Sequence, residues 1–126
     1  MRAADTNVLV RVLARDDEEQ VAVADAFVAV GAWVSLLVLQ ETVWVLERAY
    51  DVGRKHQALI LGMLLEHSSI VLESPELVAA ALVNFRANPR LEFSDCLVLE
   101  AARRANHLPV GTFDRRFAKA AGVELL

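Results

Sequence analysis

Short apolar runs of strand length alternate with longer helical patterns along the whole of this 126-residue chain. Strands are expected at Arg2–Asp5, Trp33–Ser35, Ser69–Glu73, Leu108–Gly111 and Val123–Leu125. Because a helical pattern separates successive strands, they should pair in parallel through right-handed crossovers. The alternation therefore predicts an α/β fold: a three-layer α/β/α sandwich with a mainly parallel central sheet.

The expected helices begin and end at ordinary capping and turn signals. The acidic turn Asp16–Asp17 precedes the second helix, Asp51–Val52–Gly53 ends the third, and Ser94 is a suitable N-cap for a later one. The expected ranges are Asn7–Ala14, Glu18–Val30, Leu36–Tyr50, Arg54–Glu66, Pro75–Phe85, Ser94–Asn106 and Arg115–Ala121.

Length and cysteine content suit one small cytoplasmic domain covering residues 1–126. The single cysteine, Cys96, excludes an internal disulfide and is compatible with a reducing compartment. Asp5 lies too near the N-terminus for a signal peptide. The longest uncharged stretch, Ala26–Gln40, is shorter than the roughly 18 apolar residues of a membrane span, so no membrane association is expected.

Hydrophobic residues make up 56% of the chain, and its mean hydropathy is +0.37. Every residue from Ala58 to Leu65 is apolar, with Gly62 as a gap, although a surface helix needs only one apolar stripe. The expected helix Arg54–Glu66 should therefore bury two faces, one on the sheet and one on another chain. A central position within one compact domain is the alternative.

The net charge of −4 is unfavourable for a nucleic-acid-binding protein, but the charges are distributed unevenly. Residues 1–51 carry four basic and nine acidic side chains, whereas residues 84–126 carry seven basic and five acidic ones. Such asymmetry can give an acidic protein one basic face. The basic residues near the C-terminal end are Arg103, Arg104, Arg115, Arg116 and Lys119.

Histidine and cysteine offer no chemistry in this sequence. His56, His67 and His107 are too widely spaced for a zinc motif and are expected to be surface or boundary residues. Cys96 has no neighbouring base and is expected to be a small buried hydrophobe. There is also no glycine-rich phosphate loop.

Four carboxylates stand at unusual positions. Asp5 ends the first expected strand, Asp95 follows Ser94 at a helix start, and Asp114 follows the fourth strand. Taken singly, each has a structural explanation as a helix cap or a partner of the helix dipole.

Glu41 is harder to explain in this way. Its helix neighbours Leu37, Val38, Trp44 and Val45 are all apolar, which predicts that Glu41 points toward the core. A buried carboxylate needs compensation, by a metal ion or by an arginine partner.

The four positions share one expected location, because parallel strands place their carboxyl ends at the same edge of a sheet. Carboxylates that converge there repel one another unless cations neutralise them, and oxygen-only ligands select Mg²⁺ or Mn²⁺. Two such ions suit phosphodiester cleavage, since one lowers the pKa of the attacking water and the other stabilises the leaving oxygen.

Four blocks of sequence, in order over essentially the whole chain, resemble the PIN-domain ribonucleases, especially the VapC-like toxins of VapBC toxin–antitoxin pairs. The blocks begin at Met1, Ser35, Phe93 and Pro109, and they read MRAADTNVLVRVL, SLLVLQETVWVL, FSDCLVLEAA and PVGTFDRRF.

The resemblance implies a Mg²⁺- or Mn²⁺-dependent endoribonuclease that works as a homodimer and is inhibited by a cognate VapB-like antitoxin, whose C-terminal segment covers the active site. It implies that Asp5, Glu41, Asp95 and Asp114 are catalytic residues and metal ligands, and that Thr6, Asn7 and Thr112 support them.

Two features depart from the pattern. Arg115 and Arg116 replace the further acid that follows Asp114 in some relatives, so a second metal is expected to bind weakly or only with RNA. Arg2 replaces the usual apolar residue of the first strand, which a place at the sheet edge would explain.

The expected substrate is single-stranded or looped RNA, cut to leave a 5′-phosphate and a 3′-hydroxyl. Arg115 and Arg116 are the candidate RNA-binding residues, with Arg103, Arg104 and Lys119 as further ones; a solvated helix face is the alternative. Trp33 and Trp44 could stack on bases, but their apolar neighbours favour core packing.

Three other interpretations compete with the toxin. A receiver-type switch fits poorly, because Asp5 lacks an acidic neighbour and the third strand is followed by Glu73-Ser74-Pro75. A catalytically inactive PIN-fold binding module would not need all four acids. An RNA-processing nuclease without an antitoxin is consistent with the sequence.

Overall fold

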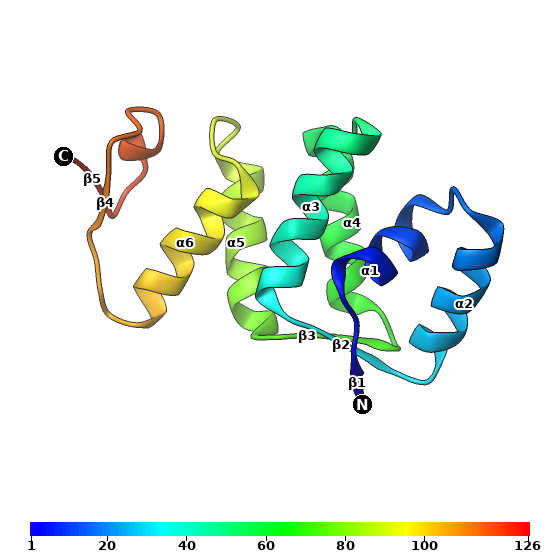
Figure 1. Ribbon diagram of the computed structural model, residues 1–126. Helices are drawn as coiled ribbons and strands as arrows, with labels where there is room; N and C mark the ends of the chain where they lie inside the picture. Colours follow the sequence, from blue (N-terminus) through cyan, green and yellow to red (C-terminus); the bar gives the residue numbers. More distant parts are fainter. The chain divides into compact units, whose positions relative to one another are not determined.

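The computed structural model describes all residues from Met1 to Leu126. The chain forms two compact units, Met1–Pro75 and Glu76–Leu126. Figure 1 shows the helices and strands of both units. No helix is long and apolar enough to cross a membrane.

The first unit contains a three-stranded parallel sheet with the strand order β1-β2-β3. In its register, Ala3 of β1 lies opposite Trp33 of β2, and Val34 of β2 lies opposite Leu72 of β3. The elements of this unit are β1 (Arg2–Ala3), α1 (Thr6–Ala14), α2 (Glu18–Ala29), β2 (Ala32–Val34), α3 (Leu36–Tyr50), α4 (Arg54–Glu66) and β3 (Ile70–Leu72).

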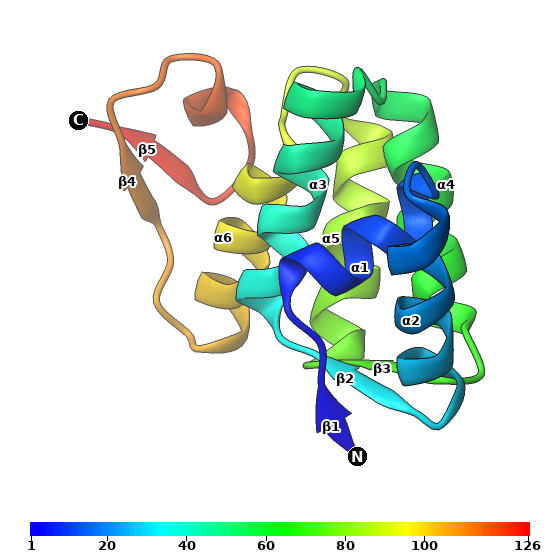
Figure 2. The same cartoon turned by 45° about the vertical axis from the view of Figure 1, so that its right-hand side comes forward.

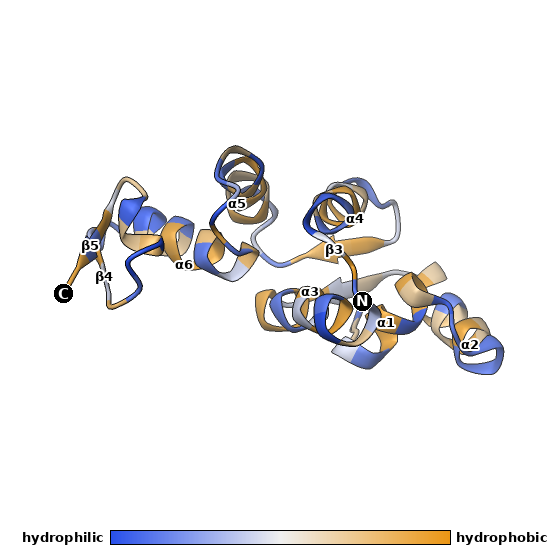
Figure 3. Cartoon of the chain, turned by 90° about the horizontal axis from the view of Figure 1, so that it is seen from above, coloured by the Kyte–Doolittle hydropathy of each residue, from blue (hydrophilic) through white to orange (hydrophobic).

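Within this unit, α1 packs against both α2 and α3, and the three lie together in Figure 2. In Figure 3, β3 lies between α4 on one side and these three helices on the other. The core contains the fully buried side chains of Leu9, Val34, Leu39 and Leu61, one each from α1, β2, α3 and α4.

The second unit has helices and a two-stranded parallel sheet. Phe85 and Phe93 meet edge to face in its core, with ring centroids 5.9 Å apart, and Cys96 is buried as predicted. Its elements are α5 (Pro75–Ala87), whose first residue belongs to the first unit, α6 (Phe93–Arg104), β4 (Val110–Thr112), a 3₁₀ turn (Phe117–Lys119) and β5 (Val123–Leu125).

The predicted α/β class with parallel strands is confirmed, and the strands are hydrogen-bonded in two sheets, one in each unit. Helices α3 and α4 and strand β5 match their predicted bounds. Arg2 lies on the edge strand of its sheet, as suggested, with its guanidinium 4.0 Å from the centre of the Phe27 ring.

The predicted start of the sixth helix was wrong. Glu92, not Ser94, is the N-cap of α6, and Asp95 at the third helical position accepts a 2.9 Å hydrogen bond from the backbone N–H of Glu92. The helix begins one residue early because this reciprocal arrangement uses the acid that follows Ser94. The predicted helix Arg115–Ala121 is reduced to the single 3₁₀ turn.

The predicted burial of one face of α3 was also wrong. Leu39, Thr42, Val43 and Leu46 are the buried residues of this helix, whereas Glu41 is exposed. Thr42 tolerates burial because its hydroxyl donates a 2.7 Å hydrogen bond to the carbonyl of Val38.

The two tryptophans are not core residues either. Trp44 is 51% exposed and Trp33 36% exposed. Trp44 shares the exposed face of α3 with Leu37, and the guanidinium of Arg48 lies 5.5 Å from the centre of its ring. An apolar surface therefore flanks Glu41 where a core was expected.

Candidate functional site

Asp5 lies just beyond the first strand and caps the helix that follows. Ala4 still bonds to β2 through its N–H, which donates to the carbonyl of Trp33 at 2.9 Å. Asp5 then adopts an extended conformation, and its Oδ1 accepts a 3.1 Å hydrogen bond from the N–H of Val8. The side chain is exposed, and no hydrogen bond engages Oδ2, which therefore remains available to a ligand.

Thr6 and Glu41 are joined directly, although they are 35 residues apart. The buried hydroxyl of Thr6, at the start of α1, donates a short hydrogen bond to Oε1 of Glu41 in α3. Because β1 and β2 are parallel neighbours, both helices leave the same edge of the sheet. The structure thus brings the first and second of the four sequence blocks into contact.

Two further contacts hold the helix that carries Glu41. The hydroxyl of Ser35 accepts a 3.1 Å hydrogen bond from the N–H of Val38 and caps α3. Glu73, just after β3, accepts a 2.8 Å bond from the N–H of Leu36 through its carboxylate. The acid that follows the third strand therefore supports α3, a role that sequence inspection missed.

In the second unit, Asp114 is fixed by the backbone around it. Its own N–H donates a 3.0 Å hydrogen bond to Oγ1 of Thr112, which was predicted to support the site. Its Oδ1 accepts from the N–H groups of Phe117 and Arg116, at 3.3 and 2.9 Å. The pKa of Asp114 is lowered from its ordinary value by these hydrogen bonds, and the bond from Phe117 has the largest effect. The guanidinium of Arg116 lowers it further.

Arg116 bridges the two predicted acids of this unit. Its Nη2 lies 2.9 Å from Oδ2 of Asp95 and 3.1 Å from Oδ2 of Asp114. One cation thus contacts two carboxylates that are 19 residues apart in sequence and offsets half of their charge. Arg115, the other predicted RNA-binding residue, is exposed and forms no such ion pair.

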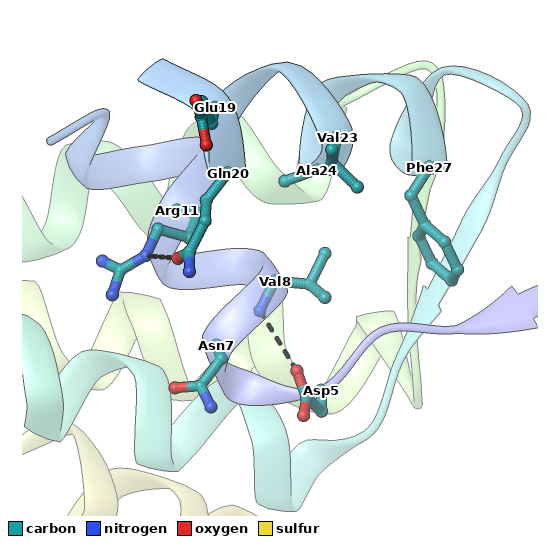
Figure 4. A pocket seen from close by; sticks show the side chains of 9 residues that line it. All are labelled: Asp5, Asn7, Val8, Arg11, Glu19, Gln20, Val23, Ala24 and Phe27. Carbon is teal, nitrogen blue, oxygen red and sulfur yellow. Dashed lines mark hydrogen bonds between the residues drawn. The ribbon is translucent and has the colours of Figure 1, made fainter. Parts of the chain in front are cut away.

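A groove of about 540 Å³ opens beside Asp5 in the first unit (Figure 4). Val8 of α1 and Val23, Ala24 and Phe27 of α2 form its apolar wall. Asn7 also lines it, which places this predicted supporting residue beside Asp5 but not in a hydrogen bond with it. The polar lining residues are Arg11, Glu19 and Gln20.

A second hollow, of about 250 Å³, belongs to the second unit. Three of its lining residues are basic, Arg90, Arg116 and Lys119, and none is acidic. Arg116 therefore faces this hollow and also contacts Asp95 and Asp114.

The donor chemistry fits a divalent ion, because all four predicted ligands are carboxylates, which magnesium and manganese prefer. In the second unit the guanidinium of Arg116 already lies between Asp95 and Asp114, so a metal ion would have to displace it or bind beside it. Each unit contributes two of the four acids, and within neither unit do three or more potential ligands come together. The four-carboxylate site therefore stays a prediction.

The sequence of the chain matches the model of one protein family. The model of the PIN domain matches residues 3–123. This chain belongs to the PIN domain family. PIN domains are generally metal-dependent nucleases, so membership indicates a nuclease for this chain. Among curated proteins no relative matches the chain.

Proposed function

We propose that this PIN-domain protein is a Mg²⁺- or Mn²⁺-dependent endoribonuclease in which Asp5, Glu41, Asp95 and Asp114 bind the metal. The observation that carries the proposal is the way these acids are held: Thr6, next to Asp5, bonds to Glu41, and Arg116 bridges Asp95 and Asp114. These contacts fix Glu41, Asp95 and Asp114, and Asp5 keeps one carboxylate oxygen free.

Each side chain has a definite task in this account. A bound divalent ion supplies a water molecule of lowered pKa and stabilises the leaving oxygen. Asp5 presents its free Oδ2 while Oδ1 is held by the helix cap, so its orientation is set before any ligand binds. Thr6 orients Glu41, and the Thr112 hydroxyl together with the N–H groups of Arg116 and Phe117 orients Asp114.

The toxin assignment and its antitoxin partner are also proposals. The groove beside Asp5 supports them, because an apolar wall with polar residues at hand suits an amphipathic segment of a partner that reaches the acids. Expression of the protein should arrest growth of a host cell, and a neighbouring gene's product should relieve the arrest. Val23→Glu, on the groove wall, should stay toxic and escape that relief. An RNA-processing nuclease would show neither effect.

The homodimer is proposed on the basis of α4. Leu59 and Met63 lie one turn apart on this helix and are 52% and 61% exposed, whereas Leu61 and Leu64 are buried. One apolar face therefore packs inward and another faces solvent, as expected for a helix shared between subunits.

Mn²⁺ titration by calorimetry tests the metal site. Asp5→Asn should weaken Mn²⁺ binding by more than about tenfold while the protein stays folded, because asparagine also caps helices. Asp17→Asn is the matched control, since Asp17 caps α2 in the same way through a 3.0 Å bond from the N–H of Gln20. Equal affinities for the two variants would refute the assignment of Asp5. The absence of binding by the wild type would favour an inactive binding module.

A further inference from the structure

We infer that Arg90, Arg116 and Lys119 form a binding site for a phosphate of the RNA backbone, next to the Asp95–Asp114 pair. The inference rests on the proposed nuclease function and assigns a place to its substrate. Nothing in the spacing of the three residues along the sequence predicts that they meet.

The hollow is lined by basic side chains. Its lining carries three cations and no acid, in a protein whose net charge is −4. Arg90 and Lys119 are exposed and form no ion pair, so their charges are not neutralised by the protein. Arg116 is paired with Asp95 and Asp114, which leaves Arg90 and Lys119 as two like charges without a counter-ion. An anion that binds beside them relieves their repulsion.

The volume of the hollow suits a phosphate. A volume of about 250 Å³ accommodates one phosphate with part of its sugar, and it is too small for a stack of bases. The planar guanidinium of Arg90 can bind a phosphate through two hydrogen bonds, and the ammonium group of Lys119 adds a point charge.

Arg116 connects the hollow to the two acids. Its side chain lines the hollow and contacts Asp95 and Asp114, so a phosphate held there lies one side chain away from two proposed metal ligands. That separation suits a phosphate neighbouring the bond to be cut. A strand fixed at this point would present its next linkage to the acids.

Binding of a labelled single-stranded RNA, followed by anisotropy in the presence of chelator, tests the site without cleavage. Arg90→Ala/Lys119→Ala should weaken binding about tenfold. It should also lower the slope of log affinity against log salt by about 0.7, the value for one phosphate contact on a single strand.

The matched control is Arg48→Ala/Lys55→Ala, which removes two exposed charges that do not line the hollow and are not among the candidate RNA-binding residues. Equal weakening by the two double variants would overturn the inference in favour of a diffuse basic surface. Arg90→Gln/Lys119→Gln repeats the test with side chains of similar length, and thermal melts verify that each variant folds.

Inorganic phosphate provides a second arm. If it stabilises the wild type but not the double variant, and RNA affinity is unchanged by the substitutions, the hollow binds free anions and the RNA assignment is overturned. Loss of nuclease activity would not by itself change RNA binding in chelator, and cleavage is measured separately with Mn²⁺ present. The two failures are therefore distinguishable. RNA binding through the hollow without any cleavage would instead contradict the proposed function.

Discussion

The hydroxyl of Thr6 donates its hydrogen bond to the carboxylate of Glu41, so the first helix of the chain fixes the acid carried by the third. Thr6 is buried, whereas Glu41 is exposed. An exposed carboxylate held by a buried donor keeps one orientation and remains open to a ligand. A fixed orientation of this kind suits a metal ligand, whereas an acid that only faces solvent does not need it.

Thr6→Val should therefore weaken Mn²⁺ binding by about tenfold, the effect typical of removing a partner of a ligand. Valine matches threonine in shape and lacks only the hydroxyl, and a thermal melt verifies that the variant folds. Thr6→Ser keeps the hydroxyl and should bind Mn²⁺ as the wild type does. Calorimetric titration of both variants measures the difference, and equal loss in both would mean that packing, not the hydrogen bond, is responsible.

Arg116 and a metal ion should compete for Asp95 and Asp114, because the guanidinium contacts both carboxylates. We expect Arg116→Ala to bind Mn²⁺ about three- to tenfold more tightly than the wild type, as the loss of two partly exposed ion pairs implies. Arg115→Ala removes the same charge one residue away and should change the affinity less. Weaker Mn²⁺ binding by Arg116→Ala would instead give Arg116 a supporting role at the site.

A pH-dependent cluster of Arg11, Asp16 and Tyr50 ties α1 to the end of α3. The Tyr50 hydroxyl donates to Asp16 at 2.7 Å, and this bond is the largest cause of the lowered pKa of Asp16; the charge of Arg11 adds to it. A carboxyl whose pKa is lower in the folded state stabilises that state above its unfolded pKa, near 3.8. That stabilisation is lost as pH falls through the folded value.

Tyr50→Phe should accordingly lower the melting temperature at pH 7, and the difference from the wild type should narrow as pH falls below about 3.8. Thermal melts at pH 7 and pH 3 measure this change. A difference that stays constant across the range would show that Asp16 does not mediate the effect.

The exposed side chains of Leu59 and Met63 should hold two copies of the chain together. Leu59→Lys/Met63→Lys is expected to weaken self-association by about tenfold or more while leaving the melting temperature of the monomer almost unchanged. Sedimentation measures the association. The matched control is Val23→Lys/Val83→Lys, at two exposed residues of α2 and α5, and it should leave self-association unchanged. A wild-type protein that sediments as a monomer would refute the dimer.

Much of the fold was predictable because local signals agree with it. Asp51 adopts a left-handed conformation that ends α3, and Gly53 precedes α4, so both helices have the bounds that their sequences indicate. The strands are only two or three residues long, which leaves little periodicity from which to place their ends.

The burial around Glu41 could not be predicted in the same way. Helix α3 is apolar on more than one side, so its sequence does not reveal which stripe meets the core. Glu41 remains a candidate ligand because Thr6 contacts it, not because it is buried. The ion pairs of Arg116 depend on tertiary proximity, which spacing alone does not contain.

The cleavage of RNA by Asp5→Asn, compared with Asp17→Asn, tests the central claim most directly. Each purified variant and the wild type would be incubated with a pool of cellular RNA, with Mn²⁺, with Mg²⁺ and with chelator. The account predicts discrete cleavage by the wild type and by Asp17→Asn that requires the metal, and none by Asp5→Asn. Equal cleavage by all three, or cleavage that persists in chelator, would contradict it.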